Sequence, residues 1–186
     1  FLVPGDPLIA TTHIDLRLRA EARGIKTRIV HGASIISAII GLSGLQNYRF
    51  GRSVTLPFAE GRNLPETPYK VLAENKARNL HTLCFLDMKA EEKRYMSVKE
   101  ALEQLLTLEE KKKQCVINLE SLAVGIARAG AEDVTVKAEK VKNLMTFSFW
   151  GPPHVLIFPA SALHFMEAEA LIRLAHAPEW VKEMIK

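Results

Sequence analysis

The sequence has few of the residues that indicate a disulfide scaffold, a zinc centre or a membrane span. It contains two cysteines in 186 residues, Cys84 and Cys115, which lie far apart in unlike surroundings. Neither a disulfide framework nor a zinc site is therefore predicted. No apolar run approaches the ~20 residues that cross a bilayer, so we expect no membrane partner. The cysteine usage fits a reducing, cytoplasmic compartment.

The sequence also lacks a large excess of charge of either sign. The 25 Lys and Arg residues are nearly balanced by 21 Asp and Glu residues, and the two signs are interleaved along the chain. A nucleic-acid partner usually demands a basic patch with interleaved aromatic residues, and aromatic residues make up 7% of the chain. We therefore expect no nucleic-acid partner. The 48% hydrophobic content is enough for a folded core and excludes intrinsic disorder.

Several catalytic motifs are missing. The chain has no G-x-G-x-x-G opening a helix, no Walker loop, no H-E-x-x-H and no G-x-S-x-G. The six histidines are scattered without the spacing of metal ligands. These absences argue against a serine hydrolase and leave no metal site to propose.

What the sequence does contain is an alternation of strand and helix patterns, which predicts a largely α/β protein with helical crossovers. Ser97 and Glu100 form a capping-box pattern before a long amphipathic helix. Strands are expected at residues 1–3, 27–31, 53–58, 81–87, 122–128 and 154–158, and helices at 10–23, 35–42, 69–80, from 98, around 139–145 and at 165–176.

The chain opens on the apolar residues Phe1-Leu2-Val3 with no initiator methionine. A strand at residue one needs neighbours that lie elsewhere, so we expect a chain that begins inside a domain. Residues 41–51 are rich in Gly, Ser and Asn, as in a joint between two units. We predict that residues 1–50 are the latter part of an N-terminal α/β domain and that residues 51–186 form a C-terminal α/β domain.

Two loops of small residues follow the first two expected strands, at Gly5-Asp6 and at Gly32-Ala33-Ser34. If those strands are parallel, both loops open on one sheet edge, where ligands of α/β proteins bind. Small residues allow a ligand close to the backbone, and Asp6 adds an acceptor. The alternative is a simple turn in which Asp6 caps the next helix.

Three later loops raise the same question, at Leu86-Asp87, at Arg128-Ala129-Gly130 and before His154. Each has an ordinary structural explanation: a tight strand exit, a rigid double-proline entry or a hydrogen-bonded histidine. Taken together, they would line a cleft between two α/β units that holds a small ligand.

An ordered series of segments closely resembles the diphthine synthase family, whose fold is that of the tetrapyrrole methylases, with archaeal members the most similar. The segments cover essentially the whole chain: Pro4-Gly5-Asp6-Pro7 to His13, His31-Gly32-Ala33-Ser34-Ile35, residues 41–51, 80–87, Ala127-Arg128-Ala129-Gly130 and 152–157. The resemblance implies two α/β domains, the first incomplete because the family's first strand and glycine-rich loop are missing here.

The resemblance also implies an S-adenosylmethionine-dependent methyltransferase, usually a homodimer. Its substrate would be translation elongation factor 2, methylated on the amino group of a 3-amino-3-carboxypropyl-histidine during diphthamide biosynthesis. Carried over by position, the cofactor-binding residues are Asp6, Ile9, Ser34, Ile35, Leu86, Ala129 and His154. No catalytic residue is assigned. Asp87, Glu60 and His154 are candidates for a general base by polarity alone, and water could take the proton instead.

Two other interpretations stay open at the level of sequence. The same fold could methylate a corrin-ring precursor or a ribosomal RNA nucleotide. The chain could also be a dimerisation and docking module with no activity of its own.

Overall fold

The structure is a computed structural model that describes residues 1–59, 61 and 63–186. The chain divides into two compact units, Phe1–Ile39 and Ile40–Lys186. The division falls inside helix α2 (Ile35–Ser43). The domain boundary predicted at residue 50 stays a prediction.

The first unit is helix and loop. Helix α1 (Ile14–Glu21) has no buried residue, and α2 begins within the unit. The strands predicted at residues 1–3 and 27–31 are wrong, because neither segment pairs with another strand among the described residues. Phe1 and Leu2 are 88% and 99% exposed. An apolar, β-branched sequence does not make a strand without a neighbouring strand to satisfy its backbone.

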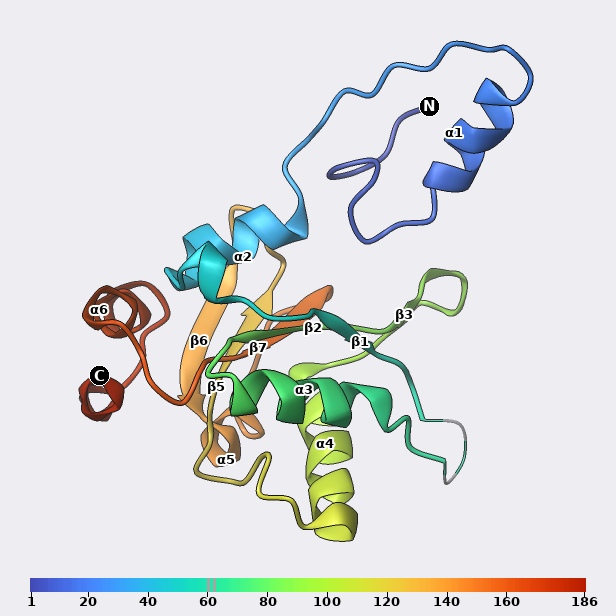
Figure 1. Ribbon diagram of the computed structural model, residues 1–186. Helices are drawn as coiled ribbons and strands as arrows, with labels where there is room; N and C mark the ends of the chain where they lie inside the picture. The colour runs from blue at the N-terminus through green and yellow to red at the C-terminus, as the bar shows by residue number, and fades with distance from the viewer. Residues whose placement is uncertain (60, 62) are drawn as a thin grey trace. The chain divides into compact units, whose positions relative to one another are not determined.

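The second unit is built on a five-stranded mixed sheet, shown in Figure 1. Its strands are β1 (Val54–Leu56), β2 (Thr82–Leu86), β5 (Leu122–Ala127), β6 (Thr135–Lys140) and β7 (His154–Phe158). Their order across the sheet is β1-β2-β7-β5-β6. β1 and β2 are parallel, whereas β7 runs antiparallel to both of its neighbours, β2 and β5.

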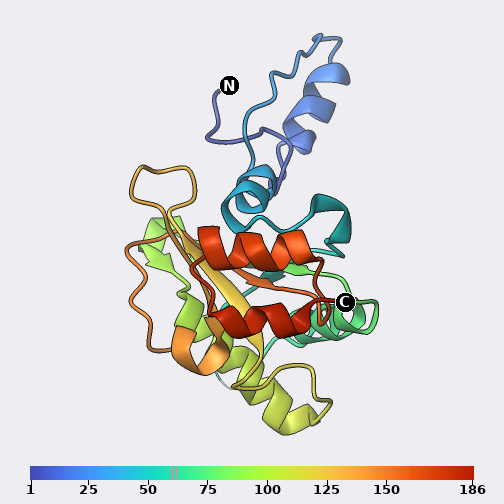
Figure 2. The same cartoon turned by 90° about the vertical axis from the view of Figure 1, so that its left-hand side faces the viewer.

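Helices cover both faces of this sheet, as Figures 1 and 2 show. Helices α3 (Thr67–Ala77) and α4 (Val98–Lys112) lie on one face, and α6 (Phe165–Leu174) lies on the other with the 3-10 helix η3 (Glu179–Met184). Side chains alternate accordingly: Cys84 and Leu86 of β2 belong to the core beneath α3 and α4, and Leu83 points to the opposite face, where it is also buried. The remaining elements are short: η1 (Asn47–Arg49), β3 (Met88–Lys89), η2 (Ala90–Glu92), β4 (Arg94–Tyr95) and α5 (Val141–Leu144).

Most predicted elements of this unit are confirmed, including the capping box of α4. The Oγ of Ser97 accepts from the backbone N–H of Glu100 at 3.1 Å, and the Glu100 carboxylate accepts from the N–H of Ser97 at 2.8 Å. The helical stretch predicted around residues 139–145 is confirmed over the single turn of α5 (Val141–Leu144). Its first two residues belong to strand β6, which the sequence pattern did not predict. β6 is an edge strand with half-exposed lysines, and its charged sequence does not resemble that of a buried strand.

A buried carboxylate fastens α6 to the start of the sheet. Glu167 is fully buried and forms an ion pair with Arg49. It also accepts from Nε2 of His81 at 2.8 Å and from the backbone N–H groups of Gln46 (3.0 Å) and His164 (2.9 Å). Burial by itself would raise the pKa of Glu167, but the hydrogen bonds from His81, His164 and Gln46 outweigh it and lower the pKa to about 2.

Candidate functional site

In the first unit, the two predicted small-residue loops pack against each other. A Cβ on Gly32 would lie 2.5 Å from the carbonyl oxygen of Gly5, so only glycine allows this approach of the two backbones. The Oδ2 of Asp6 pairs with Nδ1 of His31 at 2.7 Å. Asp6 and the loop that contains Gly32 are therefore brought together as predicted, although no strands precede them.

Asp6 is held by its own loop as well as by His31. Its Oδ1 accepts from the backbone N–H of Leu8 at 2.9 Å, and its side chain is 7% exposed. The hydrogen bond from Leu8, followed by that from His31, keeps the pKa of Asp6 below its usual value. The turn interpretation is thus correct for one carboxylate oxygen, but Asp6 does not cap α1, whose first residue is Ile14.

The other predicted residues of this unit lie near the start of α2. The Oγ of Ser34 accepts from the backbone N–H of Ser37 at 3.3 Å, which satisfies one of the free donors at the helix start. Ile35 is the first residue of α2 and is half-buried. Ile9 is 40% exposed in the loop after Asp6.

In the second unit, the topology brings the three predicted residues to one edge of the sheet. Because β7 is antiparallel to both neighbours, its first residue lies beside the last residues of β2 and β5. His154 pairs with Ala127 in the register of β5 and β7, and the adjacent Val155 pairs with Phe85 of β2. Leu86 is the last residue of β2, and Ala129 lies two residues beyond the end of β5.

His154 is fixed by the loop that precedes it. Its Nε2 is 3.2 Å from the carbonyl oxygen of Trp150, and its ring lies 5.9 Å from that of Phe149, centroid to centroid. Phe149 in turn covers Gly125 of β5, where a Cβ would come under 3.0 Å from the ring. The Nδ1 of His154 is buried and has no hydrogen-bond partner within the described ranges. A buried polar atom without a partner is a position that a ligand can satisfy.

Comparisons with known proteins show to which family the chain belongs. Residues 1–144 match the model of the Tetrapyrrole (Corrin/Porphyrin) Methylases. The diphthine synthase of Methanosarcina mazei is 50% identical over 100% of this chain and 71% of its own length. That of Methanothermobacter thermautotrophicus is 47% identical over 98% of this chain and 69% of its length. A crystal structure of diphthine synthase superposes with a TM-score of 0.86 at 42% identity, covering 99% of this chain and 68% of that one.

The chain belongs to the diphthine synthase family. The resemblance and the tetrapyrrole-methylase fold class predicted from the sequence are confirmed. Diphthine synthases are methyltransferases. Membership of the family therefore indicates an enzyme rather than a docking module alone. Within the described residues, no helix is long and apolar enough to cross a membrane.

Among the general-base candidates for a diphthine synthase, Asp87 has a structural task. Its Oδ2 accepts from the backbone N–H of Phe58 at 2.9 Å, and its carbonyl oxygen accepts from Met96 at 2.9 Å. Both contacts fasten segments to the end of β2. Glu60 lies outside the described residues, and His154 stays a candidate.

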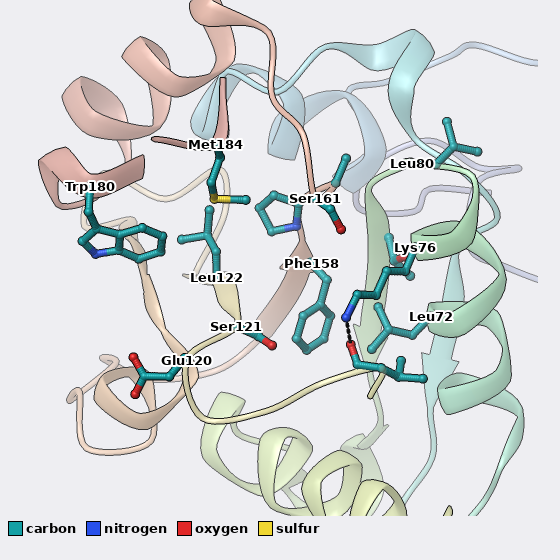
Figure 3. Close-up of a pocket in the computed structure, with 14 residues that line it drawn as sticks. Leu72, Lys76, Leu80, Glu120, Ser121, Leu122, Phe158, Ser161, Trp180 and Met184 are labelled. Atoms are coloured by element: carbon teal, nitrogen blue, oxygen red, sulfur yellow. Dashed lines mark hydrogen bonds between the residues drawn. The ribbon is translucent and has the colours of Figure 1, made fainter. Parts of the chain in front are cut away.

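One pocket of the second unit lies at the opposite ends of the strands from Leu86, Ala129 and His154. It has a volume of about 220 Å³ and is shown in Figure 3. Thr82 and Leu122, which begin β2 and β5, line it together with Phe158, the last residue of β7. Lys76 at its wall is held by the carbonyl oxygens of residues 115 and 116 at 2.8 and 2.9 Å. None of the predicted cofactor residues lines this pocket.

One residue at the same ends of the strands as His154 receives no role from the sequence, although it belongs to a loop singled out there. Arg128 lies between the strand end at Ala127 and the predicted contact Ala129, and its backbone N–H donates to the carbonyl oxygen of Pro153 at 2.9 Å. The signal was present, because Arg128 is a cation inside a motif that otherwise consists of small residues.

Proposed function

We propose that this chain binds S-adenosylmethionine and methylates the amino group of a 3-amino-3-carboxypropyl-histidine on translation elongation factor 2, a step of diphthamide biosynthesis. The observation that supports the proposal most strongly is the 50% identity to a diphthine synthase over the full chain. Acting on this factor would place the protein where translation takes place, in the cytoplasm. The homodimer implied by the resemblance is proposed with it.

The residues at the two candidate sites fit such a cofactor. In the second unit, Leu86 and Ala129 offer apolar and backbone contacts suited to adenine and ribose, and Nδ1 of His154 is a buried polar atom that lacks a protein partner among the described residues. In the first unit, Asp6 offers a carboxylate, and Ser34 a hydroxyl next to a helix start. Ile9 and Ile35 add apolar contacts.

When bound, S-adenosylmethionine supplies an electrophilic methyl group on a sulfonium sulfur, which keeps the bonding electron pair when the acceptor nitrogen takes the methyl group. The protein must therefore hold the acceptor amine without its proton and in line with the bond that breaks. Water or His154 can receive that proton. The electrophile belongs to the cofactor, which explains why the sequence needs no catalytic triad.

Methyl transfer to elongation factor 2 tests this proposal. Radiolabelled methyl transfer is measured with unmodified factor and with factor that bears the 3-amino-3-carboxypropyl group, using the whole natural polypeptide that contains this chain. We expect labelling of the modified factor only. Equal labelling of the two forms, or labelling of neither, would overturn the assignment of the acceptor.

Calorimetry with S-adenosylhomocysteine tests the cofactor independently of the acceptor. We expect saturable binding by the whole polypeptide. Sedimentation analysis of the same sample tests the dimer, for which twice the monomer mass is expected.

A further inference from the structure

We propose that Arg128 is a specificity-determining residue that binds the carboxylate of the acceptor amino acid. This inference rests on the proposed function, in which the reacting amine and a free carboxylate are attached to the same carbon of the acceptor. An enzyme that discriminates this acceptor from an unmodified histidine gains most by recognising the carboxylate, since the other neighbouring groups are apolar methylenes. A guanidinium is the side chain best matched to a carboxylate, through two parallel hydrogen bonds.

A backbone hydrogen bond holds Arg128 beside the predicted residues Ala129 and His154. Its N–H donates to the carbonyl oxygen of Pro153 at 2.9 Å, which places it directly beside His154 in space and before Ala129 in sequence. Its φ of 56° is in the left-handed region, a conformation that costs free energy for a residue with a side chain. The strand therefore ends in a turn that redirects Arg128 away from the regular alternation of β5.

The guanidinium group of Arg128 has N–H donors that no acceptor among the described residues uses. Its Nε donates to Oδ1 of Asp133 at 2.8 Å, and its Nη1 lies near Gly151, 3.6 Å from where a Cβ would be. For the two Nη atoms, the described part of the chain provides no hydrogen-bond acceptor. The Arg128 and Asp133 side chains are 41% and 62% exposed, so their ion pair is weak and does not compete strongly with a ligand.

A guanidinium at this place would serve the reaction in two ways. Pairing with the carboxylate orients the carbon that bears the amine, and this positions the nitrogen for transfer. A nearby positive charge also disfavours the protonated form of the amine, so it lowers the pKa of the nucleophile and increases the fraction that can react.

The test compares Arg128→Gln, Arg128→Lys and Asp133→Asn with the wild type, each in the whole natural polypeptide. Methyl transfer is measured against the concentration of factor bearing the 3-amino-3-carboxypropyl group, at saturating S-adenosylmethionine. Two binding measurements accompany it: calorimetry with S-adenosylhomocysteine, and the affinity of the S-adenosylhomocysteine-loaded enzyme for the same factor.

We expect Arg128→Gln to raise KM for the factor by ~10- to 100-fold, the loss typical of a charge-assisted hydrogen bond. It should weaken factor binding equally, leave S-adenosylhomocysteine binding unchanged and shift the acid limb of the kcat/KM profile to higher pH. The KM of Arg128→Lys should lie between those of Arg128→Gln and the wild type, because an ammonium group keeps the charge but cannot form two parallel hydrogen bonds with a carboxylate. Asp133→Asn should bind the factor at least as tightly as the wild type, because it removes the negative charge that competes for the guanidinium.

Three results would overturn the inference. The first is unchanged KM and factor affinity in Arg128→Gln while the wild type methylates the factor. The second is loss of S-adenosylhomocysteine binding in Arg128→Gln, which would place Arg128 on the donor side. The third is an equal loss in Asp133→Asn, which would make the ion pair a structural element of the loop. A wild type that does not methylate the factor at all would instead refute the proposed function itself.

Discussion

The two units of this chain contain similar apolar residues but use them differently. In the first unit, Val30 is 76% exposed and Ile39 is the single fully buried hydrophobic residue among those described. In the second unit, Val124, Ile126, Leu156 and Ile157 are completely buried in paired strands. Strand-like residues become a core only where another strand receives their backbone hydrogen bonds and a helix covers their side chains.

The same contrast applies to the candidate site. In the first unit, Asp6 and Gly32 are held by loop contacts: one hydrogen bond between side chains, one close backbone approach and one turn. In the second unit, Leu86, Ala129 and His154 are placed by strand register. We therefore expect substitutions in the second unit to affect stability first, and those in the first unit to affect ligand binding first.

Glu167→Gln gives the largest expected loss of stability. It removes the charge that Arg49 pairs with inside the second unit, and leaving a buried partner unpaired costs about 3–5 kcal/mol. Chemical denaturation measures this loss. Glu169→Gln is the matched control on the same helix, because Glu169 pairs with Arg173 at the surface and should cost less than ~1 kcal/mol. Equal effects of the two substitutions would contradict the assignment of the buried Glu167 as the carboxylate that stabilises the second unit.

Acid should gradually remove the contribution of Glu167 to the free energy of unfolding. The pKa of Glu167 is about 2 in the folded protein, below its ordinary value of 4.5, so its stabilisation is complete above pH 4.5 and is lost as the pH falls towards 2. Denaturation midpoints measured between pH 6 and pH 2.5 should therefore fall more steeply for the wild type than for Glu167→Gln. Parallel curves would show that this carboxyl is not the titrating group.

Gly125→Ala should have an intermediate effect, on both the stability of the protein and the binding of ligand near His154. The added Cβ displaces Phe149, which supports His154, and overpacking of this kind costs ~1–3 kcal/mol. Both the denaturation midpoint and the affinity for S-adenosylhomocysteine should decrease. Adding Phe149→Ala removes the clash, so the double variant should lose less stability than the sum of the two single variants.

Gly32→Ala should weaken ligand binding without a comparable loss of global stability. Its Cβ would collide with the carbonyl oxygen of Gly5 and separate the two loops of the first unit. We expect the affinity for S-adenosylhomocysteine to fall about tenfold, or ~1.4 kcal/mol. Gly41→Ala is the control, because open space surrounds that position in α2. A large loss of stability in Gly32→Ala would mean that the first unit is not the lightly packed one.

Asp6→Ala has the smallest expected effect, a several-fold weaker affinity for S-adenosylhomocysteine and little change in unfolding. It removes the acceptor of the Leu8 and His31 hydrogen bonds. Isothermal calorimetry with Asp15→Ala as a control on α1 measures the difference. Unchanged affinity would leave Asp6 with the role of a turn residue alone.

How far the sequence predicts this protein differs between the two units for a physical reason. The strands at Leu122–Ala127 and His154–Phe158 are dense in buried apolar residues, and the Ser97 cap is a local pattern, so all three were predictable. Strand β6 was not, because its edge position tolerates lysines. The predictions of strands at residues 1–3 and 27–31 were wrong because strand pairing depends on partner strands that the local sequence does not reveal.

The site shows the same division. Small-residue loops and the ordered resemblance pointed to Asp6, Ser34, Leu86, Ala129 and His154. The meeting of Leu86 with His154 depends on β7 entering the sheet in the reverse direction, which no local pattern encodes. Arg128 was named from the sequence only as part of a loop, because the small residues around it, rather than its own charge, define the motif.

The central position of β7 also bears on how the chain is made. β7 forms the pairings with both β2 and β5, yet it comes last in sequence among the described strands. Until residues 154–158 leave the ribosome, β1–β2 and β5–β6 are two separate ribbons with their inner edges unsatisfied. The sheet can therefore close only after residues 154–158 have been synthesised, and the nascent chain depends until then on protection from aggregation.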